Sequence, residues 1–375
     1  MPKTLTDDEM LEAIQVASEY GPTEAARRLG LARSTLQSRV DRAREKFPEL
    51  TDRVPEGHKA KGVSTLYDAE GNVKAQWVKS TIDEQRAEEA REAAIRALAE
   101  QIPPEKPVAP PKAVLTDLCA LYTLTDAHVG MLAWHREGGQ DWDLEIAEQT
   151  IVGCFAETIR QMPEAETAIF NQLGDLLHYD SLTAVTPTSG HILDADSRFT
   201  KMVEVAVRIL RRIIRMLLAK HKNVHVIMAE GNHDMASSVW LRTMFKALFE
   251  NEERVTVEDS AIPYYCFEFG KVFLGFHHSH LKRMEQIPGL MAAQFPQQWG
   301  RTVKRYCHTG DKHHAAEKDS LGIHVVQHPT LAARDAYAAR GGWHSERAMQ
   351  GITYHRQFGQ VGRIIVCPEM LEEAA

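Results

Sequence analysis

Three apolar runs in the second part of the chain each end directly in a group of polar residues, and helical patterns separate the runs. The runs and the polar residues that follow them are 118–124 with Asp126 and His128, 167–173 with Asp175, and 224–228 with Asn232, His233 and Asp234. Alternating strands and helices predict a layered α/β fold, in which ligands gather beyond the carboxyl ends of the strands. The polar groups are therefore expected to meet at one edge of a sheet.

The residue types in these groups suit a metal centre. Asp126 and His128 offer a carboxylate and an imidazole, which are ligands for manganese, iron, zinc or cobalt. Asp175 can bridge two cations roughly 3.5–4 Å apart through its two oxygens. A strand-end turn or a helix cap would explain each group alone, but three such groups in order favour a metal site.

The ordered groups Asp-x-His, Gly-Asp and Gly-Asn-His-Asp resemble the calcineurin-like metallophosphoesterase superfamily over roughly residues 118–315. The resemblance implies a layered metallophosphoesterase β-sandwich flanked by helices. It also implies that Asp126 and His128 bind a first metal, that Asp175 bridges, and that Asn232 and a later histidine bind a second metal.

The implied cofactors are two divalent metal ions, with manganese as the first choice and iron, zinc, cobalt or nickel as alternatives. The implied reaction is hydrolysis of a phosphate ester, in which the cations neutralise the phosphoryl oxygens and activate a bridging water. In this scheme His233 assists the leaving group or stabilises charge, and Asp234 holds its imidazole.

The later histidine of the second metal has three candidates, His277, His278 and His280. We choose His278, because alternation from Phe276 points it to the required side and a small residue, Ser279, follows it where the family often has glycine.

The last ligand group departs from the family pattern of Gly-His-x-His. His313 matches the second histidine, but Asp311 stands where the first is expected. Three interpretations follow for Asp311: an oxygen ligand of the second metal, a change that impairs the site, or a surface ion pair with Lys312.

The N-terminal region, residues 5–49, is expected to form three short helices, with breaks at Gly21-Pro22 and at Gly30 and a third helix starting near Arg33. Residues 22–47 resemble the helix-turn-helix family, whose last helix enters the major groove of duplex DNA. The side chains expected to read bases or grip phosphates are Arg33, Ser34, Thr35, Gln37, Ser38 and Arg42.

The charge of this region supports contact with phosphates. The whole chain has a net charge of −8, yet residues 27–46 contain seven basic and two acidic residues. A helical module that docks on protein is the alternative to DNA binding. One such module binds DNA weakly, so a homo-oligomer or a second contact is expected for tight binding.

The sequence divides into three parts by these criteria. Residues 1–50 form the helix-turn-helix domain, residues 51–112 a wing-like hairpin, a charged helix at 82–102 and a proline-rich linker, and residues 113–375 the metallophosphoesterase domain. Five scattered cysteines and the lack of an apolar run of about 20 residues predict a cytoplasmic protein without membrane contact. Trp134, Trp240 and Trp343 are interpreted as packing residues rather than as platforms for bases.

The leading hypothesis is a DNA-tethered phosphoesterase whose phosphate-ester substrate includes nucleic acid, a pairing that resembles proteins of bacteriophages and prophages. The competing hypothesis is a DNA-binding regulator or scaffold whose phosphoesterase domain is impaired by Asp311.

Overall fold

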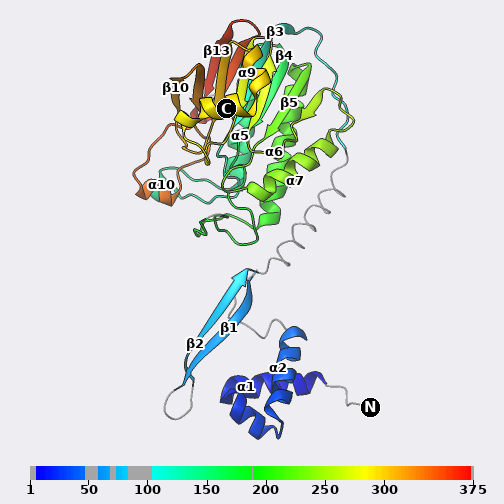
Figure 1. The fold of residues 1–375 in the computed structure, drawn as a ribbon, viewed down its shortest axis with the longest axis vertical. Helices are drawn as coiled ribbons and strands as arrows, with labels where there is room; N and C mark the ends of the chain where they lie inside the picture. Colours follow the sequence, from blue (N-terminus) through cyan, green and yellow to red (C-terminus); the bar gives the residue numbers. More distant parts are fainter. Residues whose placement is uncertain (1–5, 47–57, 68–72, 83–103, 188, 373–375) are drawn as a thin grey trace. The chain divides into compact units, whose positions relative to one another are not determined.

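The computed structural model describes residues 6–46, 58–67, 73–82, 104–187 and 189–372. The chain has two compact units, Met1–Glu89 and Ala90–Ala375 (Figure 1). The second unit contains two β-sheets that pack face to face, with helices on the outer faces. The expected class, a layered α/β sandwich, is confirmed.

The six-stranded sheet has the order β13-β12-β3-β4-β5-β6, and β3 to β6 run parallel. Its strands are β3 (Leu115–Leu124), β4 (Ala165–Gln172), β5 (Asn223–Met228), β6 (Val255–Val257), β12 (Met349–His355) and β13 (Gly359–Val366). The three apolar runs are therefore strands, as predicted, and their carboxyl ends lie at one edge.

The five-stranded sheet has the order β10-β11-β9-β8-β7, and its inner strands β8, β9 and β11 run parallel. Its strands are β7 (Tyr265–Phe269), β8 (Val272–Phe276), β9 (Lys304–Thr309), β10 (Ala316–Ser320) and β11 (Ile323–Gln327). Parallel pairing again collects the carboxyl ends of β8 and β9 at one edge.

Helices cover the outer faces of both sheets. Those of the second unit are α4 (His135–Gly138), α5 (Leu144–Gln161), α6 (Phe199–Lys220), α7 (Met235–Leu248), α8 (Ile287–Gln294), α9 (Pro296–Arg301), α10 (Ala336–Arg340) and α11 (Glu369–Glu372), with a short 3-10 turn at Met284–Gln286. No helix in the described residues is long and apolar enough to cross a lipid bilayer.

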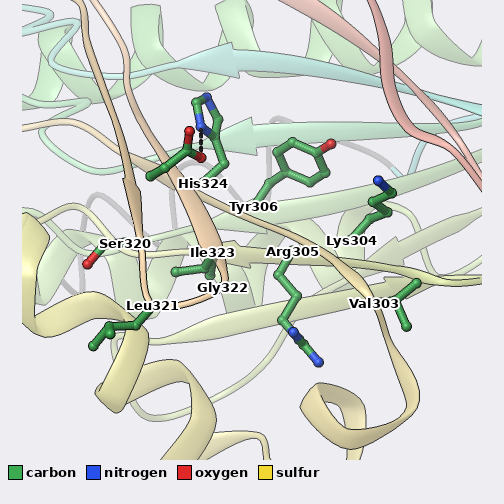
Figure 2. Close-up of a pocket in the computed structure, with 10 residues that line it drawn as sticks. Val303, Lys304, Arg305, Tyr306, Ser320, Leu321, Gly322, Ile323 and His324 are labelled. Atoms are coloured by element: carbon green, nitrogen blue, oxygen red, sulfur yellow. Dashed lines mark hydrogen bonds and ion pairs between the residues drawn. The ribbon is translucent and has the colours of Figure 1, made fainter.

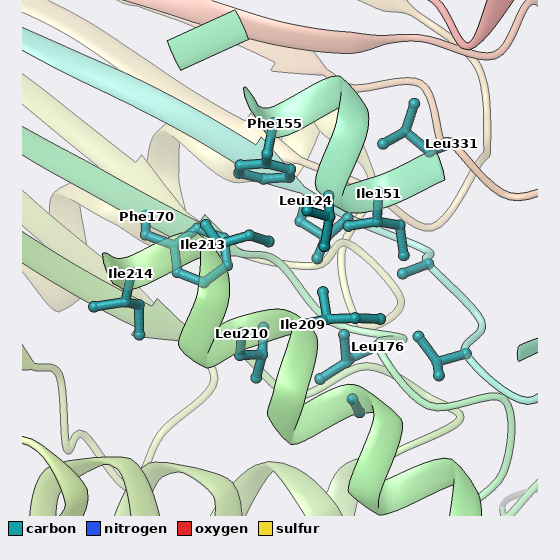
Figure 3. Close-up of a cluster of buried hydrophobic side chains, with 14 of the residues drawn as sticks. Leu124, Ile151, Phe155, Phe170, Leu176, Ile209, Leu210, Ile213, Ile214 and Leu331 are labelled. Carbon is teal, nitrogen blue, oxygen red and sulfur yellow. The ribbon is translucent and has the colours of Figure 1, made fainter. Parts of the chain in front are cut away.

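Alternation along the strands explains the layers. In β3 the side chains of Cys119 and Leu121 belong to the core between the sheets, whereas Ala120 and Tyr122 belong to the core under the helices. Successive side chains of a strand point to opposite faces, so one strand serves two cores. Figure 3 shows Phe170 of β4 among the apolar residues of α5 and α6. Each large apolar side chain buried in this way contributes about 1.5–3 kcal/mol to the free energy of folding.

The proline-rich segment is packed on the second unit where the structure describes it, from Pro104 onward. Glu105 is buried and accepts from Arg211 Nε at 2.6 Å and from Arg215 Nη1 at 3.1 Å. The backbone N–H of Val108 donates to Glu252 Oε2 at 2.9 Å. These contacts fix the segment against the helical layer.

The first unit contains α1 (Asp7–Arg28), α2 (Arg33–Lys46) and an antiparallel hairpin of β1 (His58–Tyr67) and β2 (Val73–Ile82). The expected hairpin is confirmed, and the charged helix expected at 82–102 lies almost entirely outside the described residues. A capping box between Thr6 and Glu9 starts α1, and Gly30, at φ 62°, lies in the turn before α2.

The prediction of three N-terminal helices is wrong, because α1 continues through Gly21 and Pro22. A proline in a helix removes one backbone hydrogen bond, and its ring clashes with the carbonyl four residues earlier and with the Cβ and N–H of the residue before it. Gly21 has no Cβ, which removes part of that clash. A short turn at residues 29–32 joins the end of α1 to the start of α2.

Burial of one histidine makes the second unit sensitive to acid. Tyr122 donates its hydroxyl hydrogen to His221 Nε2 at 2.8 Å, and His221 Nδ1 donates to the carbonyl of Ala165 at 2.8 Å. Burial lowers the pKa of His221 to about 4 from an ordinary 6.5. The neutral ring is favoured in the fold, so its stabilisation is complete above pH 6.5 and is lost as the pH falls toward 4.

We predict that His221→Gln reduces this acid sensitivity. Gln retains polar contacts but does not titrate, so only the wild type loses stability at this position as the pH falls. The free energy of unfolding of the wild type, relative to that of the variant, should therefore decrease by roughly 2 kcal/mol from pH 7 to pH 5. Urea unfolding at both pH values measures this difference. A constant difference would show that His221 is not held neutral.

Candidate metal centre

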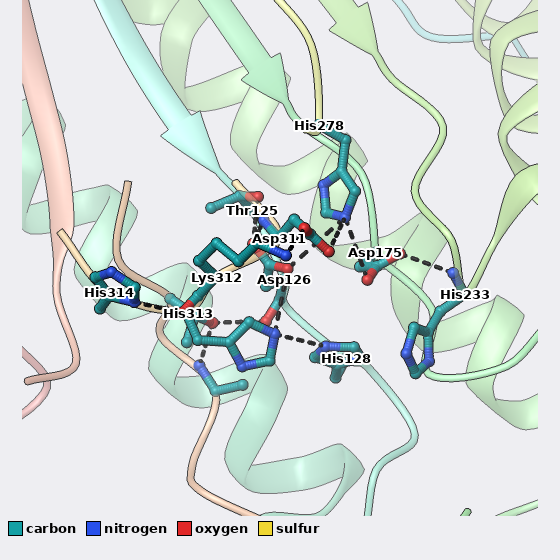
Figure 4. A network of polar contacts seen from close by, with 12 residues as sticks. Thr125, Asp126, His128, Asp175, His233, His278, Asp311, Lys312, His313 and His314 are labelled. Atoms are coloured by element: carbon teal, nitrogen blue, oxygen red, sulfur yellow. Dashed lines mark hydrogen bonds and ion pairs between the residues drawn. The ribbon is translucent and has the colours of Figure 1, made fainter. Parts of the chain in front are cut away.

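The polar groups at the strand ends meet at one place, as Figure 4 shows. Asp126 and His128 follow β3, Asp175 follows β4, and the group at 232–234 follows β5. His278 follows β8, and the group at 311–313 follows β9. The centre therefore takes side chains from both sheets.

The first cluster of potential ligands contains Asp126, His128 and His313, whose ligand atoms lie within 4.8 Å of one another. His313 Nε2 lies 3.3 Å from Asp126 Oδ1 and 3.3 Å from His128 Nε2. Burial, followed by the positive charges of His233 and His313, lowers the pKa of His128 well below its ordinary value. A neutral imidazole is the form that binds a metal.

The second cluster contains Asp126, Asp175 and His278. His278 Nε2 lies 3.3 Å from Asp175 Oδ2 and 3.9 Å from Asp126 Oδ1. His278 Nδ1 donates to the carbonyl of Leu173 at 2.7 Å, which aims Nε2 at the carboxylates. Asp126 belongs to both clusters, whereas Asp175, the bridging residue expected from the resemblance, belongs to the second.

The charge balance of the second cluster indicates a cation. Burial lowers the pKa of His278, but the charges of Asp175 and Asp126 outweigh burial and raise that pKa to about 10. Two buried carboxylates thus attract positive charge strongly to this point. Asn232 Oδ1 is also buried and accepts no hydrogen bond. A buried oxygen without a partner costs about 1–3 kcal/mol of folding free energy, and a metal ion would satisfy it.

Of the three candidate histidines, His278 is the one that lies in a cluster of potential ligands. His277 Nδ1 lies 2.9 Å from the carbonyl of Pro263, outside the ligand clusters. The ring centre of His280 lies 5.4 Å from that of His278, so His280 lies beside the centre.

The backbone at the centre is in an unusual conformation. Seven residues other than glycine have positive φ in the described part of the chain, and five of them are Asp126, His128, Asp175, Asp311 and His313. Each residue in this conformation lowers the stability of the fold by about 1–3 kcal/mol, and the conformation persists only where surrounding contacts maintain it. Backbone hydrogen bonds do so here, including Asp126 N–H to Gly174 O at 3.1 Å and His128 N–H to Asp175 O at 3.0 Å.

Asp234 does not hold the ring of His233, so that expectation is wrong. Its carboxylate is buried and accepts four backbone N–H groups, from Asp175 (3.2 Å), Leu176 (2.7 Å), Leu177 (3.2 Å) and Gly231 (3.0 Å). His233 Nδ1 instead donates to the carbonyl of His178 at 2.7 Å. Asp234 is therefore a positioning residue for the loops that carry Asp175 and Asn232.

His178 is a site residue that the sequence analysis missed. It forms a third cluster with His128 and His233, and its Nδ1 lies 3.3 Å from His128 Nδ1. Burial, with the charge of His233, lowers the pKa of His178 to about 3, so the ring is neutral at pH 7. The sequence feature that could have identified His178 is its position three residues after Asp175. His178 was not chosen because it belongs to none of the ordered groups on which the resemblance rests.

Of the three interpretations of Asp311, the structure shows the ion pair with Lys312, and Asp311 belongs to none of the ligand clusters found among the described residues. Its Oδ1 lies 4.0 Å from His278 Nε2, and its Oδ2 lies 2.5 Å from Lys312 Nζ. Its N–H donates to Asp126 Oδ2 at 3.0 Å. The carboxylate therefore faces the second cluster and at the same time pairs with Lys312.

Two of the three tryptophans expected to pack are partly exposed, which corrects that expectation. Trp240 packs against the helical core, whereas Trp134 is 50% and Trp343 58% exposed. Apolar character alone does not decide whether a tryptophan is buried.

A separate hollow of about 320 Å³ lies at the opposite end of β9 (Figure 2). Its lining includes Lys304, Arg305 and Tyr306 from the start of that strand and Asp319 and His324 from β10 and β11. The metal ligands follow the other end of β9, so the hollow does not belong to the centre.

Among known proteins, only solved structures are similar to this chain. No family model and no curated protein matches the chain. A predicted phosphoesterase from Streptococcus pneumoniae is similar at 9% identity, covering 68% of this chain and 92% of that one, with a TM-score of 0.30. An archaeal phosphodiesterase is similar at 11% identity, covering 66% and 99%, with a TM-score of 0.34. A dimetal phosphatase from Danio rerio is similar at 9% identity, covering 66% and 98%, with a TM-score of 0.36. Function is therefore inferred from the site itself.

Close packing at Gly231 provides a test of the candidate metal centre in which no candidate ligand is itself substituted. A Cβ at this position would lie 1.9 Å from Asp175 Oδ1 and 2.4 Å from Asp175 N. We predict that Gly231→Ala displaces Asp175 and abolishes stabilisation by metal. For the wild type, Mn²⁺ at about a hundredfold excess over its Kd should raise Tm by roughly 5–10 °C.

The matched control is Gly289→Ala in α8, where nothing lies within 4 Å of the added Cβ. Thermal melting with and without Mn²⁺, together with metal analysis of the purified proteins, measures the effect. Equal stabilisation of the Gly231→Ala protein and the wild type would contradict the proposed role of Asp175.

Proposed function

We propose that the second unit is a metal-dependent phosphoesterase that hydrolyses phosphate esters. The observation that supports this proposal is the pair of clusters that share Asp126, in which carboxylate and imidazole atoms from both sheets converge. Two divalent ions, with Mn²⁺ as the first choice, would supply charge neutralisation of a phosphoryl group and activation of water. Asp126, His128 and His313 would hold one ion. Asp175, Asn232, His278 and Asp311 would hold the other, together with Asp126, which belongs to both clusters.

The protein's own groups have distinct tasks in this reaction. Because the carbonyl of His178 fixes the Nδ1 proton of His233, the Nε2 atom of His233 is left to take up and release a proton at the leaving oxygen. Lys312 brings an ammonium group beside Asp311 and so adds positive charge near the phosphoryl oxygens. Asp234 keeps the loops of Asp175 and Asn232 in place.

We predict that His233→Ala lowers kcat for a phosphodiester by about 10²- to 10⁴-fold with little change in metal content, because His233 acts on the proton and is not assigned as a ligand. Hydrolysis of a chromogenic diester and a monoester in Mn²⁺ measures this effect. His355→Ala, at the end of β12 and the other edge of the sheet, is the matched control. Full activity of His233→Ala would contradict the assignment.

The alternative is a scaffold whose catalysis is lost at Asp311, and the ion pair with Lys312 is the observation that favours it. Asp311→His separates the two. If Asp311 is a working oxygen ligand, the wild type is active and this substitution does not improve it. A wild type that is inactive and metal-poor, with activity gained in Asp311→His, would support the scaffold.

We further propose that the first unit binds duplex DNA through α2. Leu36 and Val40 of α2 are buried against α1, and the opposite side is exposed. The exposed residues expected to contact DNA are Arg33, Ser34, Thr35, Gln37, Ser38 and Arg42. Their hydroxyl, amide and guanidinium groups suit base edges and phosphates.

We predict that Arg33→Ala and Arg42→Ala each weaken duplex binding across sequences and lower the slope of log Kd against log salt by about 1. Fluorescence anisotropy of a labelled duplex over a salt series measures the slope. Glu12→Gln, an exposed change on α1, should leave the slope unchanged. DNA binding that is unchanged in both Arg33→Ala and Arg42→Ala would contradict the assignment of α2 as the DNA-contacting helix.

A further inference from the structure

Three exposed aromatic side chains lie on chain segments that leave the candidate metal centre. Among the described residues, four Trp, Tyr or Phe side chains are at least half exposed: Trp134 (50%), Tyr337 (69%), Trp343 (58%) and Phe358 (65%). The first three lie on the segments that follow His128 and β11. Phe358 lies in the turn between β12 and β13, at the edge of the sheet where β3 begins. We call Trp134, Tyr337 and Trp343 the aromatic rim.

The loop that carries Tyr337 and Trp343 is tied to the metal centre at both ends. The loop, residues 331–347, is closed by the N–H of Ala348, which donates to the carbonyl of Thr330 at 3.1 Å. The hydroxyl of Thr330 donates to the carbonyl of Asp126 at 2.6 Å. The loop thus leaves the sheet and returns to it directly beside a ligand.

The segment that carries Trp134 leaves the centre only six residues earlier, at His128, so Trp134 lies within about 20 Å of that ligand along an extended chain. Arg334 joins the two segments by donating to the carbonyl of Gly138 at 3.2 Å and to the carbonyl of Trp343 at 3.3 Å. At Gly138 a Cβ would lie 2.1 Å from the carbonyl of Arg334, so the segments are in close contact.

The rings of the rim are held in place although they face solvent. The ring of Trp343 lies over Gly341, where a Cβ would be 3.1 Å from the indole, and Tyr337 meets it edge to face at 5.3 Å between ring centres. The guanidinium of Arg136 lies 5.2 Å from the ring centre of Trp134. Preordered rings lose little conformational entropy when a ligand stacks on them.

Flat rings interspersed with guanidinium groups are the chemistry that binds unpaired bases and their phosphates. Duplex DNA fits this surface less well, because its bases are stacked and their faces cannot contact the rings. An aliphatic protein surface also fits less well, because it carries no phosphate or carboxylate to pair with the arginines between the rings. We propose that the aromatic rim stacks the bases of an unpaired polynucleotide strand and leads its phosphates to the metal centre. This inference rests on the proposed phosphoesterase and names the class of its substrate.

The test uses the full-length protein and a fluorescein-labelled 15-residue oligothymidylate without divalent metal, so that binding is measured without cleavage. Stacking contributes about 1–3 kcal/mol per base, so Trp343→Ala and Trp134→Ala should each raise Kd by about 5- to 150-fold. Trp343→Phe keeps a flat ring and should recover most of the affinity. Phe358→Ala is the matched control, because it removes an equally exposed ring from the other edge of the sheet.

The outcomes separate this inference from the proposed function. Oligonucleotide binding that is unchanged in Trp134→Ala and Trp343→Ala, or weakened equally in Phe358→Ala, overturns the rim, even if the wild type hydrolyses a small diester. Binding that depends on the rim in a wild type that hydrolyses no ester supports the rim and overturns the phosphoesterase. The rim variants and the control are compared in a chain that also carries Arg33→Ala and Arg42→Ala, so that DNA contacts of the first unit do not mask a loss at the rim.

Discussion

Four backbone N–H groups from two loops point at the buried carboxylate of Asp234. Hydrogen bonds to a carboxylate are shorter and stronger than those between neutral groups, and here they join the loop after β4 to the loop after β5. Asp175 needs this support, because its backbone lies in the left-handed region. The position of Asp175, a candidate ligand, thus depends on a residue that lies outside the ligand clusters.

The packing of the two sheets fixes the remaining geometry. The clusters combine Asp126, His128 and Asp175 from the six-stranded sheet with His278 and His313 from the five-stranded sheet. The apolar core between the sheets sets the distance across which these side chains meet. A loosely packed core would let the ligand atoms drift apart, so the stability of the fold and the geometry of the centre are linked.

Much of this arrangement was open to prediction from the sequence. Apolar runs that end in polar residues identified β3, β4 and β5, and alternation from Phe276 selected His278. The role of Asp234 was not predictable, because its partners are backbone N–H groups, which every residue carries. His178 was missed because tertiary folding, rather than spacing, brings it to His128.

Other errors have equally local causes. The break predicted at Gly21-Pro22 rested on average preferences, and a glycine before a proline relieves part of the clash on which those preferences depend. Trp134 and Trp343 were assigned to the interior by residue type, although large aromatic side chains also occur on surfaces that bind ligands.

The closure of residues 331–347 at Thr330 has a consequence for how such a protein can diversify. Since both ends of the loop meet at the same backbone position, residues can be inserted or exchanged at its tip without moving Asp126. The entropic cost of a longer loop grows only slowly with its length. The length and composition of this loop can therefore change while Asp126 keeps its position.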